Sequence, residues 1–103
     1  MMKKMVVLMM VLGIGAVAQA ADIAAGRAKS GTCVACHGPN GISHNPAWPN
    51  LAGQKDQYLI RQMRAFRDGD RRDPIMSPMA QGLSDTDIEN LATYYSNLPA
   101  GGE

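Results

Sequence analysis

The stretch "GTCVACHGPNG", residues 31–41, contains both cysteines of this 103-residue chain, and a histidine directly follows the second one. Cys33, Cys36 and His37 therefore stand within one short segment. A disulfide between two cysteines this close in sequence would remove little entropy from the unfolded chain. The motif thus predicts a chemical role for these side chains rather than a stabilising cross-link.

The first twenty residues have the pattern of a secretory signal peptide. Lys3 and Lys4 precede an almost entirely apolar run over residues 5–18, and Ala18-Gln19-Ala20 supplies small residues at alternate positions. The run is shorter than the roughly 20 apolar residues of a membrane span. We therefore predict export with cleavage after Ala20 and no stable membrane anchor. An uncleaved N-terminal anchor is the alternative.

Residues 21–103 are predicted to form one domain. Loss of the two leader lysines changes the formal net charge from +1 to −1, which argues against a general nucleic-acid binder. A domain of this size is marginally stable when it relies on its own apolar core. We therefore expect a bound group to complete the interior.

The hydrophobic pattern predicts an all-α domain with three main helices and no strand. Asp22 can cap a first helix over residues 23–29. A second helix is expected from about residue 55 to 68, ending at Gly69, and a third begins after the N-cap Ser84 and stops before Pro99. The apolar stripes are Leu59, Met63 and Phe66 in the second helix, and Ile88, Leu91, Tyr95 and Leu98 in the third.

Two long loops are expected between these helices. Residues 38–53 are rich in Gly, Pro, Asn and Ser, and they include Trp48 and His44. We interpret His44 as a solvent-facing side chain. Residues 70–82 are predicted to form a charged turn followed by a loop with Pro and Met. A long irregular segment in a small domain is typical of a chain that wraps a ligand.

Three chemistries use a Cys-x-x-Cys spacing: a dithiol switch, a zinc site and a covalently attached haem. A thioredoxin-like switch requires a βαβ context, which the pattern lacks. Structural zinc takes four ligands, and adjacent Cys36 and His37 are poor partners in one tetrahedron. Cys-x-x-Cys-His is the attachment signature of c-type haem, with two thioethers and an imidazole on one helical turn. The sequence therefore predicts one covalent haem c.

An electron-carrying haem of this type takes a thioether as its sixth ligand. Only Met63, Met76 and Met79 follow the leader segment. Met63 belongs to the apolar stripe of the second helix, so we interpret it as core. Met76 and Met79 are both candidates for the ligand, and coverage of apolar surface is the alternative role for them.

The chain resembles bacterial class I cytochromes c of the c4, c5 and c553 group, and in particular one half of a dihaem cytochrome c4. The resemblance rests on "CVACHGPNG", "WPNLAGQ", "YLIRQMRAFRDGDR", "IMSPMAQGLSDTDI" and "NLATYYSNL", which begin at residues 33, 48, 58, 75 and 90. It implies a small class I cytochrome c fold around one covalent haem. Only one haem motif is present, so electron transfer between two haems within the chain is not implied.

The resemblance also implies a role for each matching residue. Cys33 and Cys36 would be the thioether anchors and His37 the proximal iron ligand. Met76, seven residues before Leu83, would be the distal ligand, with Met79 as the alternative. The remaining roles are a Pro49 carbonyl that accepts the His37 Nδ1–H, a Leu51 that packs on the porphyrin, a Trp48 that packs beside it, and a Gly26–Tyr94 contact where the first and last helices cross.

A haem with both axial positions filled predicts a one-electron carrier rather than an enzyme. The resemblance implies a periplasmic location and redox partners such as a cytochrome bc1-type complex, a terminal oxidase or a periplasmic dehydrogenase. The alternatives are a haem enzyme or gas sensor with a labile sixth ligand, and an electron-entry subunit of a larger complex. We interpret Arg61, Arg64, Arg67, Arg71 and Arg72 as a solvated helix face, with a basic docking patch as the alternative.

Overall fold

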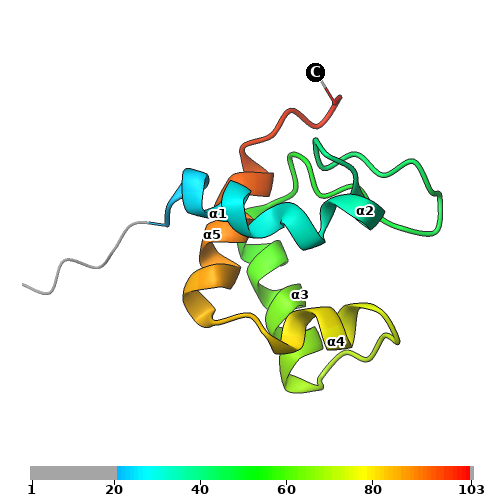
Figure 1. Ribbon diagram of the computed structural model, residues 1–103, viewed down its shortest axis with the longest axis vertical. Helices are drawn as coiled ribbons and strands as arrows, with labels where there is room; N and C mark the ends of the chain where they lie inside the picture. The colour runs from blue at the N-terminus through cyan, green and yellow to red at the C-terminus, as the bar shows by residue number, and fades with distance from the viewer. Residues whose placement is uncertain (1–20, 103) are drawn as a thin grey trace, which may run out of the picture.

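The computed structural model describes residues 21–102, and this part of the chain is helical and contains no strand. Its helices are α1 (Ile23–Lys29), α2 (Val34–His37), α3 (Asp56–Asp68), α4 (Met76–Gln81) and α5 (Asp85–Ser96). A 3₁₀ turn, Ser30–Thr32, joins α1 to α2 (Figure 1). The predicted all-α fold is confirmed, and the predicted signal peptide lies outside the described residues.

Helices α1 and α5 cross in close contact (Figure 1), and the crossing depends on Gly26. A Cβ at this position would collide with the Asn90 carbonyl and lie 2.7 Å from the Tyr94 Cβ. The Asp22 N–H also donates to the Asn90 side chain at 2.8 Å, while the Asp22 carboxylate caps α1. The predicted Gly26–Tyr94 contact is therefore confirmed.

The hydrophobic core lies where α3 packs against α5. Leu59 of α3 and Leu91, Ala92, Tyr94 and Tyr95 of α5 form one buried cluster. Helix α5 starts at a capping box, in which the Ser84 hydroxyl accepts from the Asp87 N–H and the Asp87 carboxylate accepts from the Ser84 N–H, both at 3.0 Å. It ends at Ser96, so Leu98 lies in the following turn, where it still packs against the core.

Residues 76–81 form helix α4, so the predicted loop around Met76 and Met79 is wrong. Pro78 is typical of a chain break, but here it is the third residue of the helix. Its missing N–H would have no partner in the first turn of any helix. The Asp73 carboxylate accepts hydrogen bonds from Ile75 and Met76 at 2.9 and 2.8 Å, which stabilises the start of α4.

Candidate functional site

The Cys-x-x-Cys-His motif occupies α2 and the residue before it. The His37 N–H donates to the Cys33 carbonyl at 2.9 Å, which closes one helical turn. Residues three apart on a helix lie on the same face, so the two half-buried thiols are neighbours. The Cys33 pKa is raised, mainly because burial disfavours the thiolate. This turn presents two sulfur nucleophiles and one imidazole to the interior.

The ring of His37 is held in one orientation by the loop that follows it. Its Nδ1 lies 2.9 Å from the Pro49 carbonyl oxygen, and the side chain is only 6% exposed. A carbonyl oxygen only accepts, so Nδ1 carries a proton, and in the neutral ring Nε2 is then the nitrogen with a free lone pair. A fixed ring with a neutral Nε2 is suited to metal coordination. The contact with Pro49 is the one that the resemblance implies.

Loop 38–53 presents Pro49 to His37 through its own hydrogen bonds. The N–H groups of Leu51 and Ala52 both donate to the Gly41 carbonyl, at 2.8 and 3.0 Å. The Gly53 N–H donates to the Tyr95 carbonyl of α5 at 3.0 Å. The irregular loop is thus closed on itself and fastened to the last helix. The proximal side of the site is therefore fixed largely by backbone contacts.

Tyr95 contributes a polar group to the site that the sequence motif does not reveal. Its side chain is 3% exposed, and its buried hydroxyl has no hydrogen-bond partner among the described residues. The hydroxyl neighbours Cys33 and Ser30, and burial, together with Cys33, raises its pKa. An unpaired buried hydroxyl normally costs about 1–3 kcal/mol. The Tyr95 hydroxyl thus lies beside one of the two thiols of the motif.

Helix α4 carries both candidate distal methionines, and they differ in burial. Met76 is half-buried, whereas Met79 is 41% exposed. The N–H groups of Met76 and Ile75 hold the pKa of the Asp73 carboxyl below its ordinary value. The Asp73 N–H also donates to the Ser77 hydroxyl at 2.9 Å. Asp73 therefore both accepts hydrogen bonds from the start of α4 and donates one to it. An Asp three residues before Met76 was the available signal for this cap.

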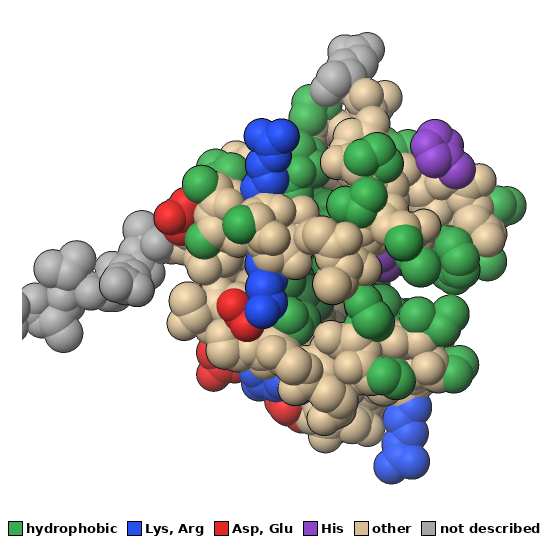
Figure 2. Space-filling model, in the orientation of Figure 1, with side chains coloured by type: hydrophobic (Ala, Val, Ile, Leu, Met, Phe, Trp, Pro, Cys, Tyr) green, Lys and Arg blue, Asp and Glu red, His purple; other side chains and the backbone are tan. Residues whose placement is uncertain are grey.

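Apolar side chains line a hollow between the part of the site that carries His37 and the helix that carries Met76. Figure 2 shows them gathered where α2 and loop 38–53 face α4. Several hydrophobic residues are left only partly covered next to the core: Cys33, Leu51, Ile60, Met63, Leu83 and Leu98. Met63 therefore belongs to the core margin, as predicted. Incomplete coverage of so many apolar side chains in one small domain fits a large, flat, apolar group.

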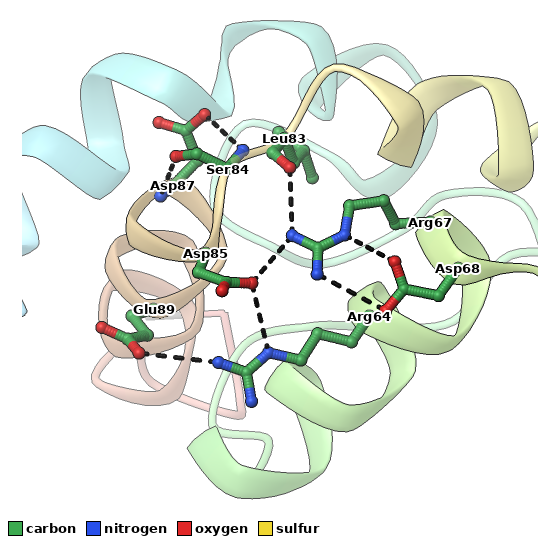
Figure 3. A network of polar contacts seen from close by, with 8 residues as sticks. All are labelled: Arg64, Arg67, Asp68, Leu83, Ser84, Asp85, Asp87 and Glu89. Atoms are coloured by element: carbon green, nitrogen blue, oxygen red, sulfur yellow. Dashed lines mark hydrogen bonds and ion pairs between the residues drawn. The ribbon is translucent and has the colours of Figure 1, made fainter.

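The predicted basic residues are largely engaged within the protein. Arg64 pairs with Asp85 and Glu89 at 3.6 Å (Figure 3). Arg67 pairs with Asp85 at 2.8 Å, and Arg71 stacks over the Phe66 ring at 4.5 Å. The interpretation of these arginines as a solvated helix face is thus incomplete, because Arg64 and Arg67 also link α3 to α5.

Other predicted features are simpler. His44 is exposed, as predicted, and Trp48 is half-buried in the same loop. Within residues 21–102, no three His, Cys, Asp or Glu side chains are grouped to hold a metal ion. None of the helices in this range is long and apolar enough to cross a membrane.

The donor set and the surroundings fit a covalently bound haem. Two unpaired thiols stand on one turn, an oriented imidazole follows them, and partly covered apolar side chains flank a hollow. An all-α domain with this arrangement is a class I c-type haem domain. The chain belongs to the cytochrome c family, whose model matches residues 23–99. It carries one covalently bound haem c and has an electron-carrier role.

Proteins of similar sequence and structure are also named as cytochromes c. The chain is 53% identical over 81 residues to cytochrome c-554(548) of Halomonas halodenitrificans, covering 76% of this chain and 98% of that protein. It is 43% identical to cytochrome c4 of Pseudomonas aeruginosa, covering 94% of this chain and 49% of the relative. The structure of reduced cytochrome c4 from Pseudomonas stutzeri superposes with a TM-score of 0.74 at 37% identity, covering 78% of this chain and 47% of that one. The chain thus spans about half the length of the cytochromes c4 that it matches.

Proposed function

We propose that this protein is a periplasmic one-electron carrier that shuttles electrons between larger redox proteins and is not itself an enzyme. Its donors and acceptors would be complexes such as a cytochrome bc1-type complex, a terminal oxidase or a periplasmic dehydrogenase. The observation that carries the proposal is the buried His37 ring, bonded to the Pro49 carbonyl at 2.9 Å on the same turn as both thiols. Export would follow from the leader segment at residues 1–20.

Each site residue has a defined task in this proposal. Cys33 and Cys36 would anchor the haem through thioether bonds, and His37 would bind the iron through Nε2. Pro49 accepts the Nδ1–H and thereby strengthens the basicity of the ring. Leu51, half-buried next to the core, packs against the porphyrin. Together these residues would hold the proximal ligand in one orientation.

Met76 is the proposed distal ligand. It is half-buried at the start of α4, whereas Met79 is 41% exposed and so less available to the interior. A haem with His and Met ligands supplies reversible one-electron chemistry at a raised potential, because the thioether favours the ferrous state. With His37 and Met76 both holding the iron, a substrate would find no free position on the metal. This is the physical reason for assigning transfer rather than catalysis.

The test compares Met76→Ala with Met79→Ala in protein made by cells that attach c-type haem. We expect Met76→Ala to remove the sulfur-to-iron charge-transfer band near the red end of the oxidised spectrum. Met79→Ala, the matched control on the same helix, should keep it. Loss of the band only in Met79→Ala would reverse the ligand assignment and leave the electron-carrier role intact.

Two measurements on the unmodified protein test the rest of the proposal. The intact mass should equal that of residues 21–103 plus one haem, and the pyridine haemochrome spectrum should be that of c-type haem. A missing charge-transfer band in unmodified protein, together with rapid carbon monoxide binding when reduced, would favour a haem enzyme or gas sensor. Stable co-purification with a larger complex would instead indicate an electron-entry subunit.

A further inference from the structure

Arg67 of α3 stands at the centre of a polar network on the distal side (Figure 3). Its side chain is 21% exposed, which is low for an arginine at a helix end. Its Nε lies 2.9 Å from the Asp68 carboxylate, and its Nη1 lies 2.8 Å from that of Asp85. The two carboxylates, Asp68 first, raise the pKa of the guanidinium above its ordinary value. The guanidinium is therefore held in place by two charged partners.

The same residue binds the segment that leaves α4 from two directions. Arg67 Nη1 donates to the Leu83 carbonyl at 3.3 Å. The Gln81 side-chain amide donates to the Arg67 carbonyl at 2.8 Å. Gln81 is the last residue of α4, and Leu83 lies in the short link to α5. The C-terminal end of α4 is thus fastened to one residue of α3 through both its backbone and its side chain.

Helix α4 depends on such fastenings because it is only six residues long. An isolated helix of this length does not form in water, since the cost of nucleation is not recovered. The Asp73 carboxylate secures its first turn, at Met76. Arg67 secures the other end, and these two anchors bracket the helix. A loss of either anchor should let α4 depart from the core.

We infer that Arg67 is a positioning residue that holds α4, and with it Met76, in the ligand position. The inference rests on the proposed role of Met76 as distal ligand. Arg67 acts on that ligand through the link at residues 81–83. Removing its side chain should raise the fraction of molecules in which Met76 has left the iron, while the rest of the fold persists.

Arg64 offers a matched control on the same helix. It also pairs with Asp85, at 3.6 Å, and with Glu89 at 3.6 Å, but its side chain is 42% exposed. Both of these ion pairs reach α5, whereas the bonds to residues 81–83 come from Arg67. Arg64→Ala therefore removes one positive charge facing α5 and leaves both bonds to the end of α4.

Imidazole binding to the oxidised holoprotein measures how often the distal position is open. Added imidazole competes with Met76, so its apparent affinity rises in proportion to the open fraction. We expect Arg67→Ala to bind imidazole up to about tenfold more tightly than the unmodified protein, because the side-chain hydrogen bond to the Leu83 carbonyl is lost. The bond from Gln81 to the backbone carbonyl of residue 67 remains. Arg64→Ala should change the affinity by less than about twofold, because exposed ion pairs contribute little.

Arg67→Lys serves as the conservative variant and also covers the case in which Arg67→Ala does not fold. A lysine keeps the charge but lacks the planar fork, so it cannot hold Asp68, Asp85 and Leu83 together. Its imidazole affinity should lie between those of the unmodified protein and Arg67→Ala. An unchanged affinity in both Arg67 variants, or an equal increase in Arg64→Ala, would overturn the inference.

Met76→Ala in the same titration separates this inference from the proposed function. If Met76→Ala keeps the charge-transfer band, the ligand assignment fails and Arg67 has no ligand to position. If Met76→Ala loses the band while Arg67→Ala binds imidazole no better than Arg64→Ala, only the role of Arg67 fails. We expect Met76→Ala to lose the band. We also expect Arg67→Ala, but not Arg64→Ala, to bind imidazole more tightly.

Discussion

The turn that carries His37 and the helix that carries Met76 are fixed in the fold by different kinds of contact. Around His37 the contacts are mainly backbone hydrogen bonds, such as those from Leu51 and Ala52 to the Gly41 carbonyl. Short neutral side chains add to them, as in the bond from the Ser43 N–H to Asn50 at 2.8 Å. Among the described residues, no charged side chain takes part in the bonds just named.

Around Met76, on helix α4, charged side chains make most of the contacts named above. The Asp73 carboxylate begins α4, and Arg67 links its end to α3 and α5. Backbone hydrogen bonds carry no titratable or net charge, whereas carboxylates titrate in acid and ion pairs are screened by salt. We therefore expect the proximal side, around His37, to stay fixed and the distal side, around Met76, to open first.

The largest expected effect comes from a glycine next to His37. Gly38 has φ +85°, and a Cβ there would collide with the Ile42 carbonyl. Gly69, at the end of α3, has φ +88° but open space around it. We expect Gly38→Ala to lower the free energy of unfolding by more than about 3 kcal/mol, because strain and collision combine. Gly69→Ala should cost about 1–2 kcal/mol from strain alone. Urea unfolding followed by circular dichroism measures both.

The glycine pair tests whether the proximal side is fixed by its backbone. Similar losses in Gly38→Ala and Gly69→Ala would mean that loop 38–53 can shift to accept a side chain. In that case the rigid description of the proximal side would be wrong. A Cβ at Gly31 would meet no atom within 4 Å, and the φ of this residue is negative, so Gly31→Ala is the neutral reference.

An intermediate effect is expected from acid. The Ser84 N–H, together with smaller contributions that include Lys29, holds the Asp87 pKa below the ordinary value of 3.8. A carboxyl with a lowered pKa in the folded state stabilises the fold above its unfolded pKa. That stability is lost as the pH falls through the lower, folded value. Stability should therefore decrease from about pH 5 downward.

Asp87→Asn isolates this contribution. An asparagine has no carboxylate to titrate, so the variant should lose about 1 kcal/mol less than the unmodified protein between about pH 6 and pH 3. Urea unfolding at each pH measures the difference. Parallel pH curves for the two proteins would show that the capping box at Ser84 does not contribute to acid sensitivity.

The smallest expected effect comes from salt. Raising the salt concentration from about 0.1 M to about 1 M shortens the screening length from about 10 Å to about 3 Å. Imidazole affinity of the unmodified protein should rise by less than about threefold, because the ion pairs around Arg67 are partly exposed. Arg67→Ala should show a smaller salt response. An equal response in both would place the salt-sensitive contact elsewhere.

The sequence predicts those parts of the fold that depend on local pattern. The Asp22 and Ser84 caps and the apolar stripe of α3 indicate helices whose bounds match the structure closely. Helix α4 does not follow from the pattern, because Pro78 is typical of a loop, although its position in the first turn permits a helix. The Asp73 side chain that caps this helix has the appearance of one more charge in a charged turn.

Residues distant in sequence account for the remaining differences. The neighbourhood of the Tyr95 hydroxyl and Cys33 follows from the way α5 lies beside the start of α2, and no spacing rule reveals it. Arg67 likewise has the pattern of a solvated face because its partners, Leu83 and Asp85, lie more than a dozen residues further along the chain. Periodicity detects neighbours on one helix but not contacts between helices.

The haem-attachment chemistry of this protein can be predicted from local sequence alone, because two cysteines and a histidine close enough to share one turn define the motif without any tertiary contact. Tertiary structure decided how the ligands are held. The Pro49 carbonyl meets His37 across twelve residues, and Arg67 reaches the end of α4 because α4 packs against α3. Covalent chemistry is local in sequence, whereas ligand geometry depends on where the folded chain brings distant groups together.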